Sequence, residues 1–266
     1  MLTLVRRSLG RVPVVFVSVV GLLATFQILL IAVARSLADT GNFQAIAQMV
    51  APDFVLKMFG GAFASFAGLS VLGFFDPLVM ILVVQFAIYL ASEPAGEVES
   101  GFLDLILARP IARHRLITRS LLVMTLGVLM ATIAMGIATW VGLQILAPRD
   151  VEWPSVGTVR TLMVHLTALA WCFGCGGLAC AAFVNRRAAA IATIGISAVA
   201  FYLADFVGAS WPTAHYAATV SPFHYFRGAE ILAGTAPTAR DLSILLTSGA
   251  TAVVIAYLKF QRRDIR

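Results

Sequence analysis

Charged residues are scarce in this chain. They make up 12% of its 266 residues, against roughly 25% in ordinary soluble domains. Hydrophobic residues account for 60%, and the mean hydropathy is +0.93. These values exclude an ordinary soluble domain and predict an integral membrane protein. The net charge of +6 is therefore first a matter of membrane topology, and nucleic acid is not expected as a partner.

Lysine is nearly absent, which excludes a phosphate-binding loop of the Gly-Lys-Ser/Thr type. Its two occurrences, Lys57 and Lys259, both follow leucine. A phosphate-binding loop needs Gly-Lys-Ser/Thr, so this chain has no such ATPase site.

Enzyme motifs are missing as well: there is no H-E-x-x-H and no G-x-S-x-G. Glu97 and Glu99 have only His114 as a histidine near them in the sequence. An intramembrane enzyme needs a paired nucleophile and base, or metal ligands, at a common depth. We therefore expect no catalytic residue, no metal site and no bound cofactor on this chain.

Six apolar runs are close to the roughly 20 residues needed to cross a bilayer. They cover approximately residues 12–34, 73–91, 116–146, 162–184, 188–209 and 242–258. Each should be a helix, because an unpaired backbone group is costly in lipid and no alternating barrel pattern is present. The sequence predicts an all-α membrane protein with one domain, residues 1–266, and six transmembrane helices.

Basic residues predict the orientation. With a cytoplasmic N-terminus, 13 of the 19 lysines and arginines fall on the inner side, so both termini are expected in the cytoplasm. The first run also resembles a secretory signal ending in Ala32-Val33-Ala34. It is longer than a signal's apolar core, which favours a retained helix.

The largest outer segment covers residues 38–72, and we expect it to lie along the membrane surface. Its apolar part, residues 60–72, is too short to cross as a straight helix. A re-entrant hairpin or a seventh span is the alternative for that part.

Residues 92–120, "SEPAGEVESGFLDLILARPIARHRLITRS", interrupt the apolar sequence between the second and third runs. Ser92, Glu93 and Pro94 are typical of a helix start. Apolar residues then recur at helical spacing until Pro110 ends the pattern, which predicts a short amphipathic helix from about Ser92 to Arg109. It could be an interfacial helix or a docking element for a cytoplasmic partner.

This segment resembles the cytoplasmic loop of permease subunits in the type-2 ATP-binding-cassette exporter family. The shared pattern is E-x-E-x-G-x-L-x-L-x-L-x-R-P-I-x-R, written here as Glu97, Glu99, Gly101, Leu103, Leu105, Leu107, Arg109, Pro110, Ile111 and Arg113. The ending "KFQRRDIR" and the segment "SPFHYFRGAEILAG" before the last run are similar to that family too.

The resemblance implies an exporter permease of a bacterial plasma or inner membrane, with the short helix acting as a coupling helix. It implies two copies of a separate ATPase subunit that binds ATP and magnesium, a second permease copy, and possible periplasmic or accessory proteins. The residues implied in coupling are Glu97, Glu99, Gly101, Phe102, Leu105, Arg109, Pro110 and Arg113. The resemblance does not identify the transported substrate. It also leaves open whether the protein transports a substrate or only transmits force across the membrane. An ion-gradient carrier is the alternative function.

Two further groups of residues have simple structural interpretations. Cys172, Cys175 and His165 could share a helix face and bind a soft metal, but packing among neighbouring glycines is the favoured interpretation. Asp76 and Asp205 lie near the outer ends of their runs, where we expect local pairing or snorkelling.

Overall fold

The computed structural model describes residues 13–40, 62, 65–100, 114–211, 215–234 and 239–261. Every regular element in these ranges is a helix. Six of the helical stretches are long and apolar enough to cross a membrane, as the sequence predicts. They are α2 (Pro13–Thr40), the stretch from α5 to α6, α9 (His114–Leu146), α10 (Val156–Phe183), α11 (Arg187–Ser210) and α14 (Ala239–Gln261).

The second stretch starts earlier than the sequence indicates and is broken. It consists of α5 (Phe66–Val71), the 3-10 turn η2 (Leu72–Phe74) and α6 (Pro77–Ala91). Asp76 caps α6, because its carboxylate accepts hydrogen bonds from the backbone N–H groups of Leu78 (2.9 Å) and Val79 (3.3 Å). Pro77, which has no N–H to satisfy, begins the helix.

Within residues 38–72, the structure describes 38–40, 62 and 65–72. The surface position expected for residues 66–72 is wrong: the side chains of Phe66, Leu69 and Val71 are buried, α5 packs against α2, and these residues belong to the second long stretch. Small residues lower the apolar character of this segment, although they permit close contact. At Gly68, an added Cβ would collide with the backbone of Ala62.

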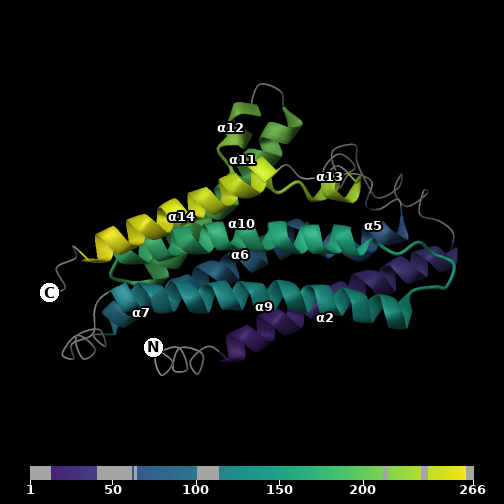
Figure 1. The fold of residues 1–266 in the computed structure, drawn as a ribbon, viewed down its shortest axis with the longest axis horizontal. Coiled ribbons are helices and arrows are strands. Elements are labelled where there is room, and N and C mark those ends of the chain that lie inside the picture. Colours follow the sequence, from purple (N-terminus) through teal and green to yellow (C-terminus); the bar gives the residue numbers. More distant parts are fainter. Residues whose placement is uncertain are drawn as a thin grey trace.

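α10 lies at the centre of the bundle, where it packs against α6, α9 and α14, while α2 packs along α9 (Figure 1). Glycines allow the central helices to approach. An added Cβ at Gly174 would lie 2.7 Å from the sulfur of Met124, and one at Gly177 would lie 3.4 Å from Cα of Ile88. Close packing of this kind holds membrane helices together where the hydrophobic effect does not act between them.

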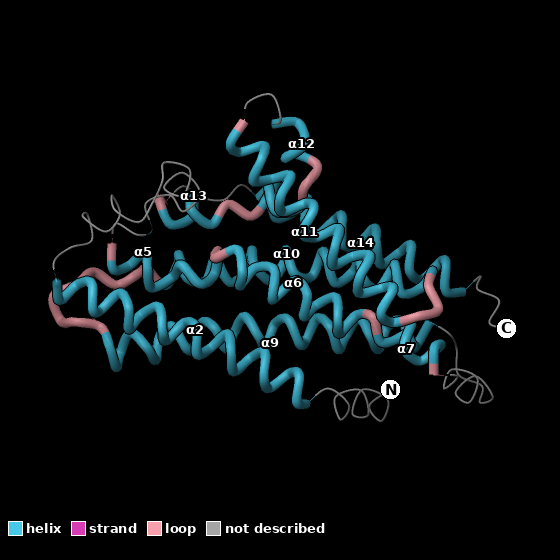
Figure 2. The backbone as a smooth tube through the Cα atoms, turned by 180° about the vertical axis from the view of Figure 1, so that it is seen from behind, coloured by secondary structure: helices cyan, strands magenta, loops and turns pink. Residues whose placement is uncertain are grey.

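The far end of α11 projects from the bundle together with the short helix α12 (His215–Thr219), as Figures 1 and 2 show. The turn η4 (Pro222–Tyr225) and α13 (Gly228–Leu232) then lead toward α14. Phe223 fixes this segment: it is buried, and its ring centroid lies 5.1 Å from that of Phe173 on α10. Oδ1 of Asp205 on α11 lies 3.3 Å from Nδ1 of His224, which confirms the local pairing expected for Asp205. The carboxylate of Asp76 likewise finds its partners locally, in the N–H groups of α6.

Candidate functional site

The helix α7 (Glu93–Glu99) follows α6 after a turn at Ser92. It starts where the sequence indicates but ends at Glu99, with Ser100 as its C-cap, so it is shorter than the single helix predicted from Ser92 to Arg109. Residues 101–113 lie outside the described part of the chain. In Figures 1 and 2, α7 lies at the end of the bundle where α9 begins and α14 ends. We call this end the α7 end.

Arg119 joins α7 to α9. Its Nη2 atom lies 2.9 Å from Oε2 of Glu97 and 3.6 Å from Oε2 of Glu93. The Arg119 and Glu97 side chains are only 3% and 4% exposed, so water does not screen this pair. The 2.9 Å contact is not aligned as a hydrogen bond, and within the described ranges Nε of Arg119 has no hydrogen-bond acceptor. The carboxylates thus hold Arg119 chiefly through charge.

Arg187 joins α7 and the end of α6 to the first turn of α11. Its guanidinium donates from Nη2 to the Tyr89 carbonyl (3.0 Å) and from Nε to Oγ of Ser92 (3.1 Å). It also lies 4.3 Å from the centroid of the Tyr89 ring, within cation–π range. The backbone N–H of Arg187 donates to Oε2 of Glu99 at 2.9 Å.

Gly96 makes room for this second arginine. A Cβ at position 96 would lie 3.1 Å from Cδ of Arg187, so the arginine stem passes directly over the glycine. Beside it, Ala95 packs against Ala181 of α10 and Ala190 of α11. Three small residues therefore bring α7, α10 and α11 together next to the charged contacts.

We call Glu93, Glu97, Glu99, Arg119 and Arg187 the α7 network. Its three carboxylates and two guanidiniums lie at the junction of α6, α7, α9 and α11. Arg119 of α9 and Arg187 of α11 thus link α7 to two different long helices.

The sequence pattern predicts part of this network. Glu97 and Glu99 are both in it, and their partners are Arg119 and the backbone N–H of Arg187. Glu93 is the acidic residue in the first turn of α7. Gly101, Phe102, Leu105, Arg109, Pro110 and Arg113 lie outside the described residues.

Arg119, Arg187 and Tyr89 are the residues that sequence reasoning missed. In the sequence pattern, Arg119 and Arg187 count only toward the basic residues of the inner side, and nothing singles out Tyr89. A signal existed for Arg119: five of the six residues after it are apolar or small, which places a charge inside an apolar helix, where a partner is required.

The cysteines behave as packing residues. Cys172 and Cys175 are buried and unpaired, and Sγ of Cys172 lies 3.1 Å from Oγ of Ser248 on α14. Nδ1 of His165 lies 2.9 Å from the Thr161 carbonyl, one turn earlier on the same helix. Within the described ranges, no group of three or more metal-ligating side chains comes together.

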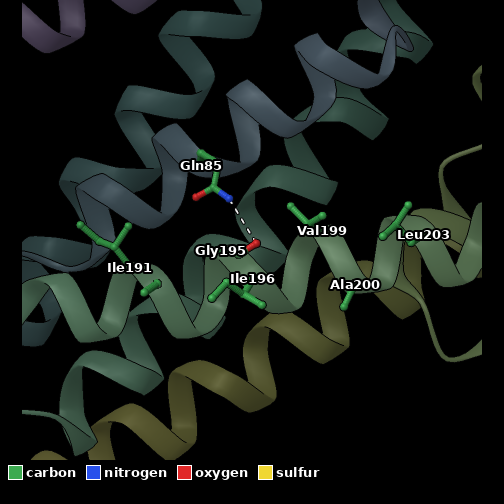
Figure 3. Close-up of a pocket in the computed structure, with 8 residues that line it drawn as sticks. Gln85, Ile191, Gly195, Ile196, Val199, Ala200 and Leu203 are labelled. Carbon is green, nitrogen blue, oxygen red and sulfur yellow. Dashed lines mark hydrogen bonds between the residues drawn. The ribbon is translucent and has the colours of Figure 1, made fainter.

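An open groove of about 490 Å³ lies along α11 (Figure 3). Its lining is apolar apart from Gln85, whose amide donates to the Gly195 carbonyl at 3.3 Å. Figure 3 shows this contact crossing from α6 to α11. A shallow groove of this composition on the side of a membrane bundle suits contact with hydrocarbon, and it carries no charge that would select a polar ligand.

Comparison with known proteins gives no relative: no family model, no curated protein and no solved structure matches the chain.

Proposed function

We propose that this chain is the permease subunit of a type-2 ATP-binding-cassette exporter, with α7 and the residues that follow it as the coupling helix. The observation that carries the proposal is the α7 network. A short helix that only floated at the membrane surface would need no ion pair as deeply buried as Arg119–Glu97. Such a pair requires precise placement, because removing two charges from water is costly unless they meet.

The sequence pattern from Glu97 to Arg113 supplies the second support. It continues directly from the described helix, so its apolar residues, Phe102 and Leu105 among them, follow a segment that is fastened to the bundle. In the proposed assembly, two copies of an ATPase subunit bind ATP and magnesium and contact this segment. The α7 end is then cytoplasmic, and the protein lies in a bacterial plasma or inner membrane.

The contact with the ATPase is tested by copurification. The chain is expressed with the product of an adjoining gene that encodes Gly-Lys-Ser/Thr, and Phe102→Asp/Leu105→Asp is compared with Phe102→Leu/Leu105→Met. We expect the Asp pair to lose the ATPase and the conservative pair to retain it, while both variants elute as folded protein in detergent. Undiminished binding by the Asp pair contradicts this docking site.

The role of Glu99 is tested separately, because its partner is a backbone N–H at the surface and its loss leaves no buried charge behind. Glu99→Gln keeps the shape but weakens the acceptor. We expect folding to be retained and substrate-stimulated ATP hydrolysis to fall, measured on the assembled complex in nanodiscs. Stimulation equal to that of the unmodified chain means that this contact does not transmit motion.

A second permease copy is part of the proposal. The number of chains in each complex is measured by mass photometry of the purified assembly, and we expect two permeases and two ATPases. A complex with one permease contradicts the paired arrangement, and cargo export would then need a second, related chain.

A further inference from the structure

Threonines recur at seven-residue intervals along α9, at positions 118, 125, 132 and 139. Seven residues are close to two helical turns, so the four side chains lie near one face, with a drift of about 20° per interval. At about 1.5 Å per residue, the series covers roughly 31 Å. That length is comparable to the hydrocarbon thickness of a bilayer.

Three of the four hydroxyls contact another helix. Oγ1 of Thr118 lies 2.6 Å from the Tyr257 hydroxyl on α14. The Trp171 indole N–H on α10 donates to Oγ1 of Thr125 at 3.1 Å. Oγ1 of Thr132 lies 2.9 Å from Oγ1 of Thr167, also on α10.

The fourth threonine, Thr139, is fully buried and donates to the Met135 carbonyl of its own helix at 2.9 Å. We call the three interhelical contacts, at Thr118, Thr125 and Thr132, the threonine ladder.

Close packing accompanies these polar contacts. A Cβ at Gly136 of α9 would lie 2.6 Å from the Met163 sulfur on α10. A Cβ at Gly249 of α14 would lie 2.5 Å from the Trp171 ring. Trp171, which donates to Thr125, therefore also packs closely against α14. α9, α10 and α14 are thus held by polar and packing contacts at several depths.

The ladder begins beside the α7 network. Thr118 and Arg119 are adjacent, so the same turn of α9 takes the ion pair from α7 and the first hydroxyl contact to α14. By contrast, α11 contacts α6 and α7 through Arg187 in its first turn and through the hydrogen bond from Gln85 to Gly195.

We propose that the threonines of the ladder are positioning residues that make α9, α10 and α14 move as one body, so that a displacement of α7 reaches the far end of the bundle. The part of this inference that concerns transmission rests on the proposed function. The part that concerns rigidity does not, because it is a property of the chain alone. Hydroxyl contacts suit this task, since each fixes the register of two helices that apolar packing alone would allow to slide.

Rigidity is tested first, without any partner, by distance measurements between spin labels in nanodiscs. Labels are placed at Ile137→Cys on α9 and Val164→Cys on α10, two exposed positions, after the three native cysteines are replaced. We compare Thr125→Val/Thr132→Val with the Thr125→Ser/Thr132→Ser pair, which retains the hydroxyls. Thr251→Val is the matched control, because Thr251 is exposed and donates only to its own helix.

We expect the valine pair to increase the population at non-native distances about threefold for each contact removed, in line with ~0.6 kcal/mol for an average hydrogen bond between membrane helices. The serine pair and the Thr251 control should match the unmodified distribution. An unchanged distribution in the valine pair overturns the ladder, whatever partner the chain has.

Transmission is tested next on the complex with its ATPase in nanodiscs, by the ratio of the ATP hydrolysis rate in the complex to that of the ATPase subunit alone. We expect this ratio to fall at least threefold in the valine pair while ATPase binding is unchanged, and the serine pair should match the unmodified chain. A loosened bundle with an unchanged ratio overturns the transmitting role. If the unmodified chain binds no ATPase, the proposed function fails, and the distance measurement still decides whether the ladder holds α9 against α10.

Discussion

Removal of the Arg119 charge is the most direct test of the α7 network, because the arginine lies near two carboxylates away from water. At an effective dielectric constant of about 20, a unit charge pair 2.9 Å apart attracts by roughly 6 kcal/mol, before the cost of desolvation is subtracted. In Arg119→Met the arginine is replaced by an apolar side chain, and Glu97 and Glu93 are left without their cation. Breaking a buried ion pair in this way costs about 3–5 kcal/mol.

The assay is thermal unfolding in a mild detergent, followed by the intrinsic fluorescence of the chain. For a chain of this size, a loss of 3–5 kcal/mol corresponds to a fall in Tm of roughly 10 °C. Arg115→Met is the matched control, because Arg115 lies one turn earlier on the same helix and is exposed. Its effect should remain within about 0.5 kcal/mol.

A double variant separates the lost attraction from the cost of an unpaired charge. In Arg119→Met/Glu97→Leu the buried carboxylate is removed together with its partner, and we expect at least half of the lost stability to return. Glu93 retains its charge there, but its side chain is 11% exposed and closer to water. A melting temperature for Arg119→Met within 2 °C of the unmodified chain refutes the reasoning, since it means that this pair contributes no net stability.

Variants at three further places are tested by the same unfolding assay. Gly96→Leu should lower stability by about 1–3 kcal/mol because its side chain displaces the stem of Arg187, whereas Gly96→Ala should be tolerated; equal effects of the two contradict the proposed crowding. Phe223→Ala should cost about 3–5 kcal/mol through the cavity it leaves in the projecting segment, and a neutral result means that this ring anchors nothing. Cys172→Ser/Cys175→Ala should leave the melting temperature insensitive to added zinc or chelator, as in the unmodified chain; a zinc-dependent rise in the unmodified chain contradicts the packing interpretation.

The spans could be predicted from sequence because lipid imposes one solution on the backbone. Any apolar run of sufficient length must be a helix, and α9, α10 and α11 lie within a few residues of their expected limits except at the start of α10. Phe66–Leu72 was misplaced because its small residues resemble a surface segment in hydropathy. These small residues allow close packing against α2 and Ala62, and that packing is visible only in the structure.

The candidate site was only partly predictable, for a related reason. Glu97 and Glu99 belong to a local pattern, but Arg119 lies near the start of the next span, α9, and Arg187 is separated from α7 by two complete spans, α9 and α10. Which arginine faces inward depends on the rotation of α9 and α11, and hydropathy alone does not fix that rotation. The seven-residue spacing of the threonines was visible in the printed sequence, yet nothing in the spacing says that Trp171 or Tyr257 lies opposite.

α6 is tied to α11 at two points: at Gln85, whose amide donates to the Gly195 carbonyl, and at Tyr89, whose carbonyl accepts from Arg187. The number of residues between these two points is therefore constrained more strictly than their identities. One inserted residue would rotate everything beyond it by about 100° and lengthen the helix by about 1.5 Å. Tyr89 and Ser92 would then face away from Arg187, even though every inserted side chain was apolar. In descendants of this chain, α6 should tolerate exchange of one apolar residue for another, while its length stays the same.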